Sequence, residues 1–495
     1  MSSIAKKPGL LLSLFPVLSL IAFLVLNIDL FKDSALLGPN QIALFIAAVI
    51  ATFIGIFILK VPYKDIEEKV IHSIGLSMQA NLILLVVGML IGLWIFSGVV
   101  PAMIYYGIKI FNPTLFLPLT CIVCAVVSLA TGSSWSTGGT VGIALIGVGQ
   151  ALGIPTSMVA GAVISGAYFG DKLSPLSDTT NLAPAMAGTD LFTHVRYMLF
   201  TTVPSIIIAL IGFTILGFFY GGSSSDLSQV NVVMETIDSI FNITPFLFIL
   251  PLFVFVLVAK RTPALPALIL GCLVGAVFVL IFQQELLRKM LGDSFGFKSV
   301  YGKLIEVAHG GFKMESDNEV ISSLLTRGGM SAMLNTVWII LMSMVFGGVM
   351  EVTGMLEVIG FAILKMVRGT ASLIAATVSS AFFVNLTAGD QYLSIVLPGR
   401  MFKPTFEKFN LAPRNLSRSL EDAGTITSVL VPWNTCGAYF STILGVSTGA
   451  YLPFCFFNLI NPFMAILIAA FGFKIEKLSE SGTDEENVAV VPNLG

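Results

Sequence analysis

Long runs of apolar residues, separated by short polar segments, make up most of this chain. A run of about 20 apolar residues crosses the hydrocarbon of a bilayer as an α-helix, and residues 10–28, 41–59 and 244–258 are examples of such runs. Other runs are interrupted in the middle by glycine, proline, hydroxyl and acidic residues. The pattern therefore predicts an all-α polytopic membrane protein with about ten transmembrane helices, two of which are broken at mid-membrane, and two re-entrant hairpins.

The interruptions recur along the chain at a nearly constant spacing. The recurring pairs are Gly92 and Gly348, Gly98 and Gly354, Thr131 and Thr387 (256 positions apart), Pro175 and Pro432 (257) and Pro155 and Pro413 (258). Matching interruptions in two halves are typical of transporters built from inverted repeats, and they mark the binding site. We predict a first inverted repeat at residues 1–220, an external linker at 221–242, a second inverted repeat at 243–474 and a disordered cytoplasmic tail at 475–495.

Composition supports the membrane assignment and excludes a soluble domain. Hydrophobic residues make up 56% of the chain and charged residues 11%, too few charges to cover a water-exposed surface. Lys and Arg concentrate in those loops that share one side when the N-terminus is placed inside. We therefore expect a multi-pass protein with both termini in the cytoplasm, in contact with membrane lipid and without a nucleic-acid partner.

Two segments must enter and leave the membrane on the same face to preserve this sidedness. We predict re-entrant hairpins at residues 114–150 and 370–398, because irregular backbone at that depth survives only in protein or beside a wet cavity. Their polar tips supply the candidate site residues Ser133, Ser134, Thr137, Thr387 and Asp390. At a spacing of 256, Asp390 replaces Ser134. The alternative is that the hydroxyls of the first tip only satisfy backbone groups in a turn.

A broken helix is predicted after each hairpin, at residues 157–190 and 416–447. Pro175 and Pro432 each remove a backbone donor and displace a carbonyl, so the helix kinks or unwinds there. Freed carbonyls with nearby hydroxyls and carboxylates are suitable ligands for a hard cation such as sodium. The further candidate ligands in these segments are Ser174, Thr179, Thr180, Asn181, Asn434 and Thr435.

Five carboxylates lie in the same predicted segments. They are Asp171, Asp178, Asp390, Glu421 and Asp422. A charged Asp at the bilayer centre costs about 2.5–3.5 kcal/mol even on the lenient insertion scale, so these groups should be partnered or line water. One carboxylate binds either a proton or a sodium ion, and that competition is sufficient for exchange.

Four of these carboxylates also have a structural alternative. Asp171 could pair with adjacent Lys172 or with a distant base, and Asp178 could be the N-cap of the following half-helix. Glu421 and Asp422 could form a surface ion pair with Arg418, three residues before Glu421.

Other motifs do not suggest an enzyme. Cys121 and Cys124 lie in an apolar run without a second pair or a nearby histidine, which disfavours a zinc or redox site. His72, His194 and His309 fall in predicted loops and form no protease motif. No nucleotide-binding motif is present, so we expect transport driven by an ion gradient, without a cofactor.

The polar segments resemble a known family. The runs Thr131-Gly-Ser-Ser-Trp-Ser-Thr-Gly-Gly-Thr140 and Ser165-Gly-Ala-Tyr-Phe-Gly-Asp-Lys-Leu-Ser-Pro-Leu-Ser-Asp-Thr-Thr-Asn181, with Gly188-Thr-Asp190 and His194, are similar to those of the NhaC sodium/proton antiporters. The resemblance implies a bacterial inner-membrane antiporter with inverted repeats, often dimeric. It assigns the motif positions to Asp171, Ser174, Asp178, Thr179, Thr180 and Asn181, with Ser133, Ser134 and Thr137. Ser133 and Ser136 depart from the residues expected in many members, which leaves substrate selectivity open.

The sequence therefore predicts sodium/proton exchange, with sodium held at Asp171 and Asp178 and lithium as a possible substitute. A second reading is exchange of organic anions such as malate and lactate, with Arg414 or Arg418 as the anion partner. A third reading, an ion-responsive channel or sensor, agrees less well with two inverted breaks.

Overall fold

The computed structural model describes residues 7–220, 227–260, 262–314 and 319–478, and the described chain is built from helices without a β-strand. Within the described residues, eight helices are long and apolar enough to cross a membrane, or ten if two bent pairs each count as one span. The all-α polytopic architecture predicted from the apolar runs is confirmed. Helices satisfy their own backbone hydrogen bonds, which is the requirement that a bilayer imposes.

The helices up to residue 240 are, in order, α1 (Leu10–Phe31), η1 (Lys32–Leu37), α2 (Pro39–Phe53), η2 (Ile54–Ile58), α3 (Tyr63–Phe96), α4 (Val99–Ile110), α5 (Pro113–Thr131), α6 (Ser134–Thr137), η3 (Gly138–Gly142), α7 (Ile143–Ala151), α8 (Thr156–Leu173), α9 (Asp178–Ala187), α10 (Leu191–Tyr220) and α11 (Leu227–Ile240).

The helices after residue 240 are η4 (Pro245–Phe248), α12 (Ile249–Ala259), α13 (Ala264–Phe282), α14 (Gln284–Leu291), η5 (Gly292–Ser294), α15 (Phe297–Gly310), α16 (Glu319–Leu325), η6 (Met330–Met333), α17 (Leu334–Val352), α18 (Met355–Leu364), α19 (Thr370–Ala388), α20 (Gln391–Lys408), α21 (Pro413–Leu420), η7 (Glu421–Thr425), η8 (Ser428–Leu430), α22 (Thr435–Leu444), α23 (Thr448–Tyr451), η9 (Leu452–Phe454) and α24 (Phe456–Ala470).

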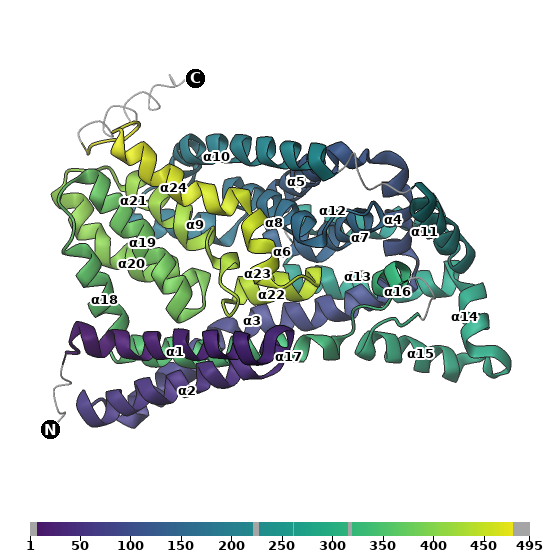
Figure 1. The fold of residues 1–495 in the computed structure, drawn as a ribbon, viewed down its shortest axis with the longest axis horizontal. Helices are drawn as coiled ribbons and strands as arrows, with labels where there is room; N and C mark the ends of the chain where they lie inside the picture. Colours follow the sequence, from purple (N-terminus) through teal and green to yellow (C-terminus); the bar gives the residue numbers. More distant parts are fainter. Residues whose placement is uncertain (1–6, 221–226, 261, 315–318, 479–495) are drawn as a thin grey trace, which may run out of the picture.

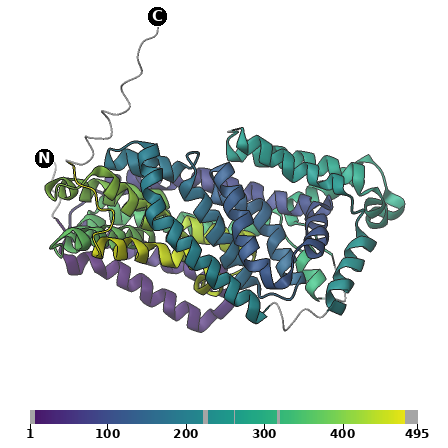
Figure 2. The ribbon, with the colours of Figure 1, turned by 90° about the horizontal axis from the view of Figure 1, so that it is seen from above.

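The helices pack as two groups. α1, α2, α3 and α17 lie against one another along one side of the molecule, with α13 on α3 (Figure 1). α5 packs along α8, α10 packs on α5 and α24, and α9 lies against α20 and α21. Two views place α14 and α15 at one end of the molecule and α18 and α20 at the other (Figures 1 and 2). The polar residues of both broken segments lie in the second group.

Helix boundaries recur at the spacing that the sequence predicts. α5 and α19 are both 19 residues long, and each ends at a glycine with positive φ, Gly132 (70°) and Gly389 (66°), 257 positions apart. A β-carbon would meet Leu176 Cβ at 2.5 Å at the first glycine and Ser343 Oγ at 1.8 Å at the second. Both sites therefore require glycine for conformation and for space.

The breaks follow the same register. α8 stops before Pro175 and resumes as α9, while the helical run from α21 through η8 stops before Pro432 and resumes as α22. The hairpin register differs from the predicted one by a residue, because the N-caps after the two glycines are Ser133 and Asp390. Asp390 thus corresponds to Ser133, not to Ser134. The inverted orientation of the halves stays a prediction.

Three further expectations need correction. The returning arm of the second hairpin, α20, continues to Lys408 instead of ending near residue 398. The three histidines lie in helices α3, α10 and α15, not in loops. The first tail residues are held in place, since Glu476 O accepts from Ala412 N at 3.0 Å. Residues 479–495 of the tail and 221–226 of the linker lie outside the described residues, and residues 227–240 of the linker form α11.

Candidate functional site

The break between α8 and α9 is a short loop closed by side chains. Ser177 is the N-cap of α9, and its hydroxyl accepts from Thr180 N at 3.5 Å. Asn181 Nδ2 donates to Ser177 O at 2.7 Å and to Pro175 O at 3.0 Å, which fixes the loop from its exposed side. Ser174 is fully buried, and its hydroxyl accepts from Leu176 N at 3.3 Å.

The last carbonyls of α8 are not left free. The Thr180 hydroxyl reaches Lys172 O at 3.0 Å and Asp171 O at 3.2 Å. Thr180 therefore compensates for the backbone donors that the break removes.

Asp171 joins this break to the tip of the first hairpin. Its Oδ2 accepts from the backbone N of Ser134 at 3.0 Å and from the Ser134 hydroxyl at 2.6 Å, and the Ser177 hydroxyl lies beside the carboxylate. Asp171 is 9% exposed. Donors aimed at an ionised carboxylate form strong, short hydrogen bonds, so Asp171 is held in a defined position with oxygen atoms around it.

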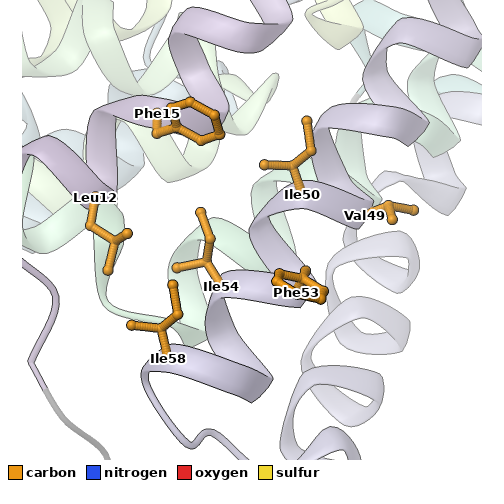
Figure 3. Close-up of a pocket in the computed structure, with 7 residues that line it drawn as sticks. All are labelled: Leu12, Phe15, Val49, Ile50, Phe53, Ile54 and Ile58. Carbon is orange, nitrogen blue, oxygen red and sulfur yellow. The ribbon is translucent and has the colours of Figure 1, made fainter.

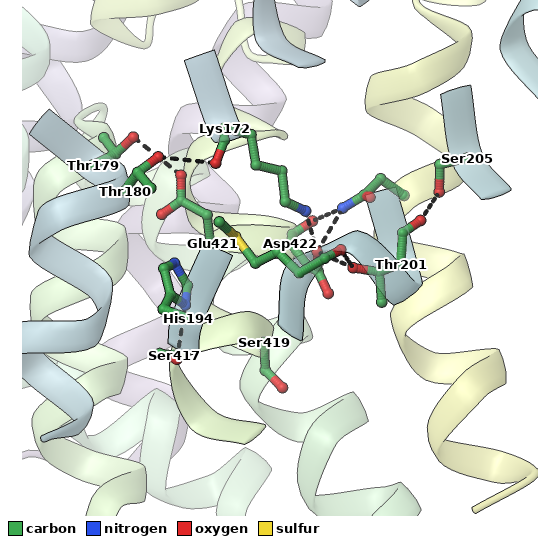
Figure 4. Close-up of polar contacts among 12 residues, drawn as sticks. Lys172, Thr179, Thr180, His194, Thr201, Ser205, Ser417, Ser419, Glu421 and Asp422 are labelled. Carbon is green, nitrogen blue, oxygen red and sulfur yellow. Dashed lines mark hydrogen bonds and ion pairs between the residues drawn. The ribbon is translucent and has the colours of Figure 1, made fainter. Parts of the chain in front are cut away.

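Lys172 and Asp422 form an ion pair between the two broken segments, and both side chains are fully buried (Figure 4). Asp422 Oδ1 also accepts from Asn461 Nδ2 at 2.9 Å and from Thr201 Oγ1 at 3.0 Å. This geometry contradicts the alternative in which Asp171 pairs with Lys172. It also contradicts the alternative of a surface pair with Arg418. The ion pair ties α8 to η7.

Glu421 has far fewer partners than Asp422. It is fully buried, its Oε1 accepts from Thr179 Oγ1 at 3.0 Å, and its Oε2 has no hydrogen-bond partner within the described part of the chain (Figure 4). Glu421 begins the π-helical turn η7, and such turns are frequent at functional sites.

The tip of the second hairpin is a network of caps. Asp390 Oδ1 caps α20 by accepting from Tyr392 N at 2.9 Å and Leu393 N at 3.0 Å. Asn434 caps α22 and donates to Asn385 Oδ1 at 3.0 Å. Asn385 in turn donates to Gly424 O at 2.6 Å across the second break. These residues hold the hairpin against the broken segment.

The remaining predicted residues do not reach the Asp171 carboxylate through any recorded hydrogen bond. The hydroxyl of Thr137 bonds Ser133 O at 3.0 Å and that of Thr387 bonds Phe383 O at 2.8 Å, both within their own helical turns. The Ser133 hydroxyl accepts from Ser136 N at 3.1 Å as an N-cap. Thr435 is hydrogen-bonded through its N to Gly389 O at 2.9 Å. For Ser133 and Thr137, the alternative that the hydroxyls of the first tip satisfy local backbone describes the geometry.

Asp178 differs from the prediction in a useful way. It is the first residue of α9 and not its N-cap, which is Ser177, and it is exposed. Its charge is close enough to interact with Asp171. Asp178 therefore stands at an accessible edge of the buried carboxylate.

Sequence reasoning missed several partners. Ser177, Thr201, Asn385 and Asn461 contact the predicted carboxylates or breaks but were not selected. Ser177 lies in the polar run at residues 165–181 and Asn385 lies two residues before Thr387 in the second predicted hairpin, so both carried a usable signal. Thr201 and Asn461 are single polar residues in long apolar helices, and only the fold shows their contacts with Asp422.

A protein-family model described as the Na+/H+ antiporter family matches residues 166–473. This chain belongs to the Na+/H+ antiporter family. It is 40% identical over 451 residues to the malate-2H(+)/Na(+)-lactate antiporter of Bacillus subtilis, with 91% of this chain and 92% of the relative covered.

Two relatives named Na(+)/H(+) antiporter NhaC are identical to this chain to a similar extent. That of Alkalihalophilus pseudofirmus is 38% identical (89% of this chain and 91% of the relative), and that of Bacillus subtilis is 35% identical (86% and 91%). The resemblance to NhaC is confirmed, and the protein is a transporter and not an enzyme.

One apolar groove in the described part of the chain is not an ion site. Its volume is about 580 Å³, and it opens between α1 and the α2–η2 segment without a polar lining atom (Figure 3). The lining residues are Leu12, Phe15, Val49, Ile50, Phe53, Ile54 and Ile58. An ion requires oxygen ligands, so the polar cluster around Asp171 remains the candidate site.

Proposed function

We propose that this antiporter exchanges sodium, or lithium in its place, for protons across the bacterial cytoplasmic membrane by alternating access. The observation that carries the proposal is Asp171, a nearly buried carboxylate held by Ser134, with the Ser177 hydroxyl beside it, where the first hairpin meets the first break. Family membership supports sodium and protons as the transported ions.

The exchange follows from competition at one carboxylate. A sodium ion bound by Asp171 needs further oxygen ligands, and the hydroxyls of Ser134 and Ser177 are adjacent. When a proton occupies Asp171 the carboxyl is neutral and attracts no cation. Asp178, exposed beside the site, supplies a second negative charge along the approach of the cation.

Organic-anion exchange is a second candidate function, favoured by one relative and one side chain. The relative at 40% identity is named for malate and lactate. Arg418 is fully buried, its guanidinium lies 4.3 Å from the centre of the Tyr197 ring, and its Nε and Nη2 have no partner within the described residues. A buried guanidinium with free donors is a suitable partner for a carboxylate.

Reconstituted vesicles with an imposed proton gradient separate these functions. Internal pH is followed as sodium, lithium, potassium, malate or lactate is added outside, for the wild type and for Asp171→Asn. We expect sodium and lithium alone to dissipate the gradient in the wild type, and the variant to be inactive although it inserts and purifies normally. A response only to malate or lactate would replace sodium/proton exchange by anion exchange, and full activity of Asp171→Asn would refute the proposed site.

Orientation and assembly belong to the same proposal. We infer cytoplasmic termini and a homodimer. Labelling of single cysteines placed at residues 3 and 490 with a membrane-impermeant reagent tests the orientation, and mass determination of the detergent-solubilised protein tests the dimer.

A further inference from the structure

Hydroxyl groups lie between two buried carboxylates of the proposed exchanger. The Ser177 hydroxyl lies beside Asp171 and 3.2 Å from Thr179 Oγ1, and Thr179 Oγ1 donates to Glu421 Oε1 at 3.0 Å. A hydroxyl both donates and accepts, so a row of hydroxyls can pass a proton by exchanging hydrogen bonds. The row connects the first broken segment to the second.

Glu421 is suited to receive a proton because it lacks a dedicated counter-ion. The nearest cation, Lys172, is paired with Asp422, which has two further donors. Glu421 Oε1 accepts from the Thr179 hydroxyl, the Thr425 hydroxyl lies nearby, and Oε2 has no hydrogen-bond partner within the described residues. A buried carboxylate with so few partners is far less costly in its protonated form.

The helices around η7 differ in the titratable residues that they carry. Of the helices that pack on η7, α19 and α24 carry no charged residue. α9 contributes Asp178, α21 contributes Arg414 and Arg418, α20 contributes Tyr392, Arg400, Lys403, Glu407 and Lys408, and α8 contributes Asp171 and Lys172.

His194 contacts the helical run that carries Glu421. Its Nδ1 lies 2.9 Å from Ser417 Oγ, and Ser417 precedes Glu421 by four residues, one turn along the continuous run from α21 into η7. His194 is fully buried and its Nε2, like Glu421 Oε2, has no partner within the described residues (Figure 4). Asp190, exposed before α10, is near enough to His194 for their charges to interact.

We propose that Asp171 is the sodium-binding carboxylate and that Glu421 is the proton relay, connected to Asp171 through Ser177 and Thr179 and to the surface past His194. The inference rests on the proposed sodium/proton exchange and assigns sodium binding and proton transfer to two different carboxylates. When sodium approaches Asp171, the Asp171 proton passes to Ser177 Oγ, the Ser177 proton to Thr179 Oγ1, and the Thr179 proton to Glu421 Oε1. Asp171 becomes a carboxylate, Glu421 becomes a carboxylic acid, and both hydroxyls are regenerated.

Glu421→Gln provides the first test, in vesicles that report two reactions. Sodium/proton exchange needs net proton release, whereas exchange of isotope-labelled sodium for unlabelled sodium does not. We expect Glu421→Gln to lose sodium-driven proton movement by about 100-fold or more, a typical effect of removing a proton-transfer group, and to retain sodium/sodium exchange. Asp171→Asn should lose both reactions.

Thr179 tests the row itself. Thr179→Val removes the hydroxyl without changing the shape of the side chain and should slow sodium/proton exchange about tenfold, while Thr179→Ser should restore it. Ser205→Ala is the matched control, because its buried hydroxyl bonds only Thr201 O at 2.7 Å in its own helix. His194→Gln should slow proton movement but not sodium/sodium exchange.

Failure of the proposed exchange and failure of the proposed proton relay give different experimental results. If the wild type shows no sodium-dependent proton movement, the proposed function fails. If the wild type exchanges normally and Glu421→Gln keeps the wild-type rate and pH profile, the relay is wrong. Loss of sodium/sodium exchange in a well-folded Glu421→Gln protein would also overturn it, since Glu421 would then belong to the sodium site.

Discussion

The buried ion pair between Lys172 and Asp422 gives a stability prediction that can be worked from the structure. Lys172→Met keeps most of the side-chain volume but leaves the Asp422 carboxylate without its counter-ion. Breaking a buried pair by removing one partner costs about 3–5 kcal/mol. Because Thr201 and Asn461 still donate to Asp422 Oδ1, we expect the lower end, about 3 kcal/mol.

The expected loss translates into a modest thermal shift. Domains of 150–250 residues lose about 2–4 °C per kcal/mol, and larger proteins lose less, so the melting temperature of Lys172→Met should fall by about 6 °C at most. The assay is the fraction of detergent-purified protein that stays monodisperse after heating. Lys303→Met serves as the control, since the Lys303 ion pair with Glu306 (3.1 Å) is partly exposed and should contribute little.

A second variant separates charge from packing. In Lys172→Met with Asp422→Asn, the amide still accepts from Thr201 and Asn461 but no longer leaves a buried charge. The double variant should melt above Lys172→Met; with Asp422→Asn measured alone as well, the double-mutant cycle gives the coupling between the two sites. The reasoning is refuted if Lys172→Met melts with the wild type, or if the double variant melts no higher than the single one.

Two other predictions concern the second half. Gly389→Ala should lower the melting temperature strongly, because it adds about 1–2 kcal/mol of left-handed strain and places a β-carbon 1.8 Å from Ser343 Oγ. Gly310→Ala is the control, since it has open space around it and should leave the melting temperature unchanged. Equal melting temperatures of the two variants would contradict this prediction. Glu476→Ala should change stability by less than about 1 kcal/mol in the same assay, because its 2.7 Å ion pair with Arg414 is partly exposed; a large loss would show that this pair holds the tail.

The sequence predicted features that depend on local backbone chemistry. Prolines 175 and 432 do interrupt helices, and the positive-φ glycines 132 and 389 do end the first arm of each predicted hairpin. Proline and glycine act through their own backbone, so their effects can be read from a single position.

Features that depend on distant side chains could not be predicted in the same way. Lys172 and Asp422 are 250 positions apart, and no local pattern shows that they pair. The one-residue difference in the hairpin register also needed the structure, because Ser133 and Ser134 are both hydroxyl residues and only the cap geometry distinguishes them. Asp178 was grouped with Asp171 by proximity in sequence, whereas the helix start places it in an exposed position.

The matching breaks of the two halves carry different chemistry. At a spacing of 257, Asp171 corresponds to Ser428, Glu421 corresponds to Ile164, and Asp422 corresponds to Ser165. Each half therefore keeps acidic groups at positions where the other has none. If one ancestral segment was duplicated, both copies kept the glycines and prolines that shape the backbone, while the acidic positions diverged. After such divergence neither repeat alone would carry all the acidic groups needed for ion exchange. Selection would then act on the fused pair of repeats as one heritable unit.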